Sequence, residues 1–111
     1  MITLTLMTEW RDWPLQVVEN DGLPDSYAID EIGEVVRLSG DLLAAIGTWD
    51  EAFQSTYVEA DPARSGFVDE TARERFIADG RRLAERIKRE AGQSIVVEYA
   101  GDGSIPPETV R

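Results

Sequence analysis

The stretch Ser39–Tyr57, SGDLLAAIGTWDEAFQSTY, contains the pattern on which the fold prediction depends. Its large apolar residues recur at spacings of four, three, four and four positions: Leu42, Ile46, Trp49, Phe53 and Tyr57. This spacing places all of them on one face of an α-helix. Ser39 stands directly before them and is a favourable N-cap. We therefore predict an amphipathic helix over about 40–57, whose apolar face must be buried against another layer.

A second amphipathic helix is predicted over 69–91. Apolar and small residues form one face of it, namely Ala72, Phe76, Gly80, Leu83, Ile87 and Ala91. Asp69 or Thr71 can cap its start, and Gly92 stands where a C-cap glycine is typical. Glycine in mid-helix costs about 1 kcal/mol relative to alanine. Gly80 therefore predicts that another element approaches the helix closely.

Three segments are predicted as strands, over 2–7, 13–19 and 94–99. Residues 20–37 are interpreted as a long connection that can hold a short strand, and 101–111 as an irregular tail. The element order is β-β-α-α-β, in one domain over 1–100. Two amphipathic helices need a sheet face to cover. The predicted class is therefore α/β (α+β): a two-layer sandwich with about three strands and both helices on one face.

The chain contains no histidine and no cysteine. It therefore lacks the commonest general base, the commonest transition-metal ligand, disulfides and thiol nucleophiles. Phosphate-binding and nucleophile-elbow motifs are absent too, and the calcium-loop pattern at 61–72 has alanine at its third and twelfth positions. Carboxylate pairs, such as Asp30 with Glu34 or Asp41 with Asp50, are the remaining acid–base option. We expect no enzymatic activity, no cofactor and no metal.

The formal net charge is −11, and it is distributed unevenly. Residues 1–61 contain 13 acidic residues against two arginines, whereas residues 62–111 contain nine residues of each sign. Such a field repels nucleic acid and anionic membranes and attracts a basic protein partner. The alternative interpretation is that the acidity only keeps the protein in solution. Because the N-terminus has no basic leader and no apolar run approaches the roughly 20 residues of a membrane span, we expect a cytoplasmic protein.

Several short strings occur together in an order that resembles a known group. They are Trp13-Pro14-Leu15, Leu38-Ser39-x-x-Leu42, Trp49-Asp50-x-x-Phe53, Asp61-Pro62-x-x-Ser65-Gly66-Phe67 and Phe76-x-x-x-Gly80-Arg81. The set resembles small acidic actinobacterial proteins that are similar to immunity proteins of contact-dependent and other polymorphic toxin systems. The resemblance implies a binding protein that neutralises a toxin, such as a nuclease-type domain, by covering its active site. A small carboxylate-based enzyme, a ligand-binding protein and a structural subunit of a larger assembly remain as alternatives.

The predicted partner-binding residues combine acids with aromatic anchors, because interfaces of this kind use both. In the connection they are Asp25, Tyr27, Asp30, Glu31 and Glu34, and near the first helix Asp41, Asp50, Glu51, Glu59 and Asp61. Trp10 and Trp13 are three residues apart, so in an extended chain they point to opposite faces. We expect one of them to pack inward and the other to be partly exposed. The alternative is that the acids form a solvated loop without a target.

Overall fold

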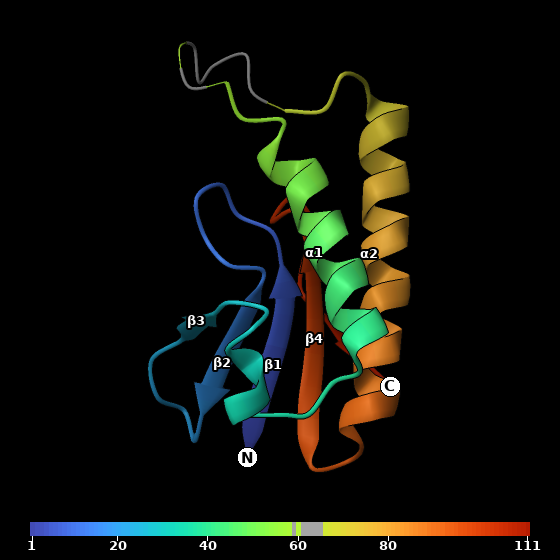
Figure 1. Ribbon diagram of the computed structural model, residues 1–111. Coiled ribbons are helices and arrows are strands. Elements are labelled where there is room, and N and C mark those ends of the chain that lie inside the picture. Colours follow the sequence, from blue (N-terminus) through green and yellow to red (C-terminus); the bar gives the residue numbers. More distant parts are fainter. Residues whose placement is uncertain (59, 61–65) are drawn as a thin grey trace.

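The computed structural model describes residues 1–58, 60 and 66–111 and shows two helices lying on one face of a mixed sheet (Figure 1). The sheet has five strands in the order β3-β2-β1-β4-β5. Their bounds are β1 Ile2–Met7, β2 Leu15–Glu19, β3 Asp25–Tyr27, β4 Ile95–Gly101 and β5 Glu108–Val110. β1 pairs in parallel with β4, while the remaining pairs are antiparallel. The parallel pair requires a crossover, and both helices lie within it.

Alternation along the central strands decides which face of the sheet the helices cover. Leu4 and Leu6 of β1 are fully buried, and so are Val97 and Tyr99 of β4. The residues between them, such as Thr5, are only partly buried. Since successive side chains of a strand point to opposite faces, one face forms the core under the helices and the other has no helix over it.

Helix α1 covers Gly40–Gln54 and helix α2 covers Glu70–Ala91, which confirms the two predicted helices. The Ser39 hydroxyl accepts a hydrogen bond from the Leu42 amide, and the Asp69 carboxylate accepts one from the Ala72 amide. Asp69, rather than Thr71, is therefore the cap of α2. Helix α1 ends at Gln54, earlier than the predicted residue 57, because Ser55 and Thr56 form a turn.

The two helices meet at an aromatic contact. The Trp49 ring stacks on Phe76 with 4.6 Å between ring centroids, and its indole N–H donates to the Phe76 carbonyl oxygen at 2.9 Å. The buried Tyr99 hydroxyl donates to the Ile77 carbonyl oxygen at 2.6 Å. Gly80 lies directly against Trp49 and Tyr99, so the predicted close approach is confirmed.

The prediction of about three strands is wrong, because the sheet has five. The connection 20–37 contains β3, the short strand allowed for there, and a 3-10 helix, η1 Ile32–Glu34, and it buries Ile32 and Val36 in the core. The segment expected to be an irregular tail contributes β5, which pairs with β4. Each added strand is three residues long, too short for an alternating pattern to be visible in the sequence.

Candidate partner-binding surface

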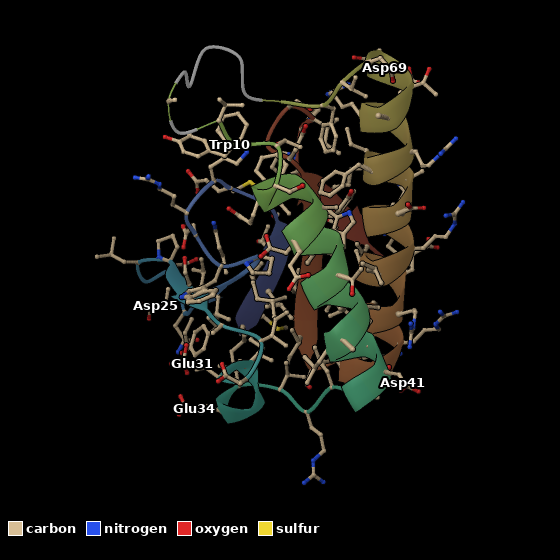
Figure 2. All side chains as sticks on the ribbon, turned by 45° about the horizontal axis from the view of Figure 1, so that its top comes forward. Trp10, Asp25, Glu31, Glu34, Asp41 and Asp69 are labelled. Carbon is tan, nitrogen blue, oxygen red and sulfur yellow. The ribbon has the colours of Figure 1, made fainter. Side chains whose placement is uncertain are left out.

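The acids of the connection are exposed and gather on the side of the molecule away from α2. Strand β3 contributes Asp25, and the turns around η1 contribute Asp30, Glu31 and Glu34. Figure 2 shows Asp25, Glu31 and Glu34 along the same side, apart from α2. Within the described part of the chain, no ion pair involves these carboxylates. Among the described residues, no base therefore neutralises their charges by an ion pair.

Two of these acids line a cleft of about 440 Å³ beside β2 and β3, which we call the strand cleft. Its lining residues are Ile2, Val17, Glu19, Leu23, Asp25, Tyr27, Glu34 and Val35. Leu23 is 88% exposed and lies beside three carboxylates of the cleft lining, those of Glu19, Asp25 and Glu34. Glu19 and Leu23 are not among the partner-binding residues predicted from the sequence. Leu23 could have been noticed as a large apolar residue directly after the turn Asn20-Asp21-Gly22.

Glu31 differs from its neighbours because its carboxylate has a partner in its own turn. It accepts a hydrogen bond from the Ala28 amide at 3.2 Å, although the side chain remains exposed. This arrangement satisfies a backbone donor at the entrance to η1. Glu31 therefore stabilises the turn that presents Asp30 and Glu34, and replacing it would disturb local structure as well as charge.

The loop between β1 and β2 is fastened to the end of α1 by Gln54, a residue that the sequence analysis did not select. Its side-chain amide donates to the Glu9 carbonyl oxygen at 2.9 Å and to the Asp50 carboxylate at 3.1 Å. Its side-chain oxygen accepts from the Arg11 amide at 3.0 Å. Arg11 has a positive φ of 65°. One glutamine thus holds a tightly turned loop against the helix.

Trp10 and Trp13 occupy opposite environments in this loop, as predicted. Trp10 stacks on Phe53 with 5.3 Å between ring centroids, and its indole N–H donates to the Thr56 hydroxyl at 3.1 Å. Trp10 therefore anchors the loop (Figure 2). Trp13 is 51% exposed. The loop is held in place while one large aromatic ring remains available to solvent.

Trp13 lines a small pocket of about 280 Å³ together with Arg11, Asp12, Asp50 and Gln54, which we call the loop pocket. Burial raises the pKa of the Asp50 carboxyl. The hydrogen bond from Gln54 acts in the opposite direction, and the negative charges of Glu51 and Asp12 raise the pKa further. The Asp50 carboxylate is thus held in a partly buried position beside the exposed Trp13. Its charged form lowers the stability of the fold there.

The remaining predicted residues are not part of this assembly. Asp41 lies at the start of α1, away from Asp25, Glu31 and Glu34 (Figure 2). Glu51 is exposed on the outer side of α1. Glu59 and Asp61 lie outside the described residues. Asp41 and Asp50 are nine positions apart on one helix, which is about 13 Å along its axis, so they cannot act as an acid–base pair.

The strand cleft and the loop pocket lie along the same strand. Tyr27 of the cleft pairs with Leu15 at the start of β2, and Trp13 precedes Leu15 by two residues. Ile29 links this strand region to α1, because its side chain lies against Gly47. Each of the two hollows thus contains carboxylates and one exposed apolar residue, Leu23 in the strand cleft and Trp13 in the loop pocket.

Two observations hold for the described residues alone. No group of three or more acidic side chains there is arranged to hold a metal ion. No helix within 1–58, 60 and 66–111 is both long and apolar enough to cross a bilayer.

Comparison with protein families places this sequence in a known group. The family described as Serratia CdiI immunity protein-like matches residues 2–102. The match spans β1 to β4 and both helices, and β5 lies beyond it. No curated protein matches the chain. With nearly its whole length matched, the chain belongs to the Serratia CdiI immunity protein-like family.

Proposed function

We propose that this chain neutralises a basic toxin domain by covering the toxin's active site with the acidic surface along β2. The observation that carries the proposal is the strand cleft, where Glu19, Asp25 and Glu34 surround exposed Leu23. Membership of an immunity-protein family supports a binding role. The uneven charge supports a basic partner, because an acidic field speeds the encounter with one.

Two kinds of residue have different tasks in this proposal. The exposed carboxylates Asp25, Asp30 and Glu34 steer the encounter, and rim charges of this kind act mainly on the association rate. Trp13 and Leu23 provide the apolar anchors that hold the complex, so they act mainly on the dissociation rate. Trp13 is well suited to this task because Gln54 fixes its loop before binding, which lowers the entropy lost on association.

The test uses the toxin domain that the chain is found to bind and a kinetic binding series in rising salt. The triple variant Asp25→Asn, Asp30→Asn, Glu34→Gln should associate at least about tenfold more slowly at low salt and show a flatter salt dependence. Glu31 is left intact because it accepts a hydrogen bond from Ala28. A matched triple on other surfaces, Glu74→Gln, Glu85→Gln, Glu98→Gln, removes the same charge and should change association much less.

A second measurement separates occlusion from binding elsewhere on the toxin. If the surface covers the active site, toxin saturated with this chain should no longer bind a substrate analogue. Simultaneous binding of analogue and chain would refute occlusion while leaving an immunity role in place. Equal association of the two triple variants would refute the placement of the surface.

A further inference from the structure

A groove runs along the outer surface between α1 and α2, away from the acidic surface. It encloses about 620 Å³. Its floor contains Trp49, Phe76 and Leu83, and its sides are formed by Ala45, Thr48 and Ala52 of α1 and by Asp79, Arg82 and Arg86 of α2. Trp49 and Phe76 are nearly buried, so Leu83 is the partly exposed apolar residue of the floor, and small side chains form its α1 side. The groove is thus a largely apolar channel with charged residues on one side.

The α2 side of the groove is positively charged, although the chain as a whole is strongly acidic. Asp79, Arg82 and Arg86 follow one another at helical spacing, and the same stripe continues to Arg75 in one direction and Arg89 in the other. Four arginines thus accompany one aspartate, which is paired with Arg82 at 2.8 Å. This stripe would attract a negatively charged surface.

The outer side of α1 has the opposite charge. Helix α1 contains no basic residue, and its exposed acids Asp41 and Glu51 lie ten positions apart on that side. Ala44 and Thr48 lie between them and are also exposed. The outer side of α1, with its small and acidic side chains, therefore adjoins the groove, whose α2 side is basic.

The level of each acid along α2 follows from two contacts between the helices. The Ser39 amide donates to the Glu90 carboxylate at 2.6 Å, so the start of α1 lies beside the end of α2. Trp49 stacks on Phe76 nearer the other end. Asp41 is therefore level with the turn that contains Arg86 and Arg89. Glu51 is level with the turn that contains Arg75.

We propose that a second copy of this chain occupies the groove, in a two-fold dimer whose axis runs parallel to the helices. Rotation about such an axis places α1 of each copy over α2 of the other. It does not shift either helix along its own length. Asp41 then faces Arg86 and Arg89 of the second copy, and Glu51 faces Arg75. Each ion pair forms twice because the interface is symmetric. The carboxylates of the strand cleft lie on another side and stay available to a toxin (Figure 2).

The experiment is sedimentation of the purified full chain without any partner, over concentrations from about 1 μM to about 1 mM. The unaltered chain should form dimers within this range. Glu51→Arg and Arg75→Glu should each weaken dimerisation about tenfold or more, because each places like charges together twice. The double variant, Glu51→Arg with Arg75→Glu, should restore it. Glu85→Arg makes the same charge change on the α2 side that faces β5 and should leave the dimer intact.

Each contrary outcome overturns the proposal. If the chain stayed monomeric over the whole concentration range, the groove would have to bind a helix of another protein. A dimer that Glu51→Arg weakens no more than Glu85→Arg would have another interface. Circular dichroism of every variant checks that the fold is retained. Because no toxin is present, the result does not depend on the proposed toxin-binding surface.

Discussion

Gly80 shows how one missing side chain determines the contact between α2 and its neighbours. A β-carbon at this position would overlap the Trp49 ring and the Tyr99 hydroxyl, both of which are held by hydrogen bonds. Gly80→Ala gains up to about 1 kcal/mol in helix propensity. Overpacking in a closely packed core costs about 1–3 kcal/mol. We therefore expect a net loss of stability, measured as the free energy of unfolding in urea.

The control for this prediction is Gly40→Ala at the start of α1, where an added β-carbon meets no atom within 4 Å. Without a clash, only propensity acts, so the variant should be neutral or more stable by less than about 1 kcal/mol. If both alanine variants were stabilised alike, the close contact at Gly80 would be wrong.

Asp50 predicts a dependence of stability on pH. Its folded-state pKa is raised, first by burial, so folding is favoured by the protonated form. The stabilisation of the folded state by the protonated carboxyl is fully present below the unfolded-state pKa of 3.8. It is lost as the pH rises through the folded-state pKa. Asp50→Asn should therefore be more stable than the unaltered chain at pH 7, with an advantage that disappears below about pH 4. Urea unfolding at a series of pH values measures it.

The same substitution connects stability with binding. If Asp50 contributes to the toxin-binding surface, Asp50→Asn should bind the toxin more weakly although its folded state is more stable. Such an opposition between stability and function is common at functional residues. A stability difference that stayed constant between pH 3 and pH 8, the range about the carboxyl pKa, would show that the carboxylate ionises freely in the folded protein.

Residues of the candidate surface could be predicted only where their own type carried the signal. The exposed acids follow from their charge. The contrast between Trp10 and Trp13 was predicted from alternation in an extended chain. The chain turns at Arg11, however, and Trp10 lies inward because it stacks on Phe53. Gln54 could not be found this way, because its importance comes from reaching Glu9, Arg11 and Asp50 at once. A glutamine on a helix surface has the same appearance in a sequence whether it binds a loop or only water.

At the scale of elements, hydrogen bonds between Ser39 and Glu90 connect the start of α1 to the end of α2. The Ser39 hydroxyl caps α1 and also donates to the Glu90 carboxylate at 2.9 Å, while its amide donates to the same carboxylate. Ser39→Ala and Glu90→Ala should each cost about 1 kcal/mol. Because they remove one shared network, the double variant should cost about 0.5–1 kcal/mol less than the sum.

A double-mutant cycle in urea measures this coupling, and Glu85→Ala on the β5 side of α2 serves as the control partner for Ser39→Ala. Additive losses for Ser39 with Glu90 would mean that the exposed carboxylate exchanges freely with water.

The helices were predictable because each repeats its apolar stripe over several turns and carries its own cap. The strands β3 and β5 were not, since three residues show no period and their partners are set by tertiary pairing. The sequence also predicts surface ion pairs within α2, such as Arg81 with Glu85. In the structure, Arg81 instead contacts Glu108 of β5 at 2.8 Å. The ion pair between α2 and β5 thus forms in place of the pair within α2 that local spacing favoured.

Across the whole molecule, the strand order converts the uneven charge of the sequence into uneven charge in space. Strands β3, β2 and β1 come from the acidic first part of the chain and form one half of the sheet, while β4 and β5 form the other half. The arginine-rich helix α2 lies against β4 and β5 (Figure 1). The acidic surface along β2 and the basic side of the groove therefore face different directions, so two partners could bind without competing.

The extent of the folded domain gives the last prediction. The sequence suggests a domain over 1–100, and the family match ends at residue 102, yet β5 lies beyond both. Ile105 and Val110 pack against the core, so a chain that ends at Asp102 should lose about 2–4 kcal/mol of stability in urea unfolding. Glu108→Ala should lose less than about 1 kcal/mol, because its partner Arg81 and Glu108 itself are 43% and 45% exposed. The comparison separates packing from charge, since only the truncation removes the apolar contacts. If the truncated chain unfolded at the same urea concentration as the full chain, β5 would be a peripheral addition, and the domain would end where the sequence suggests.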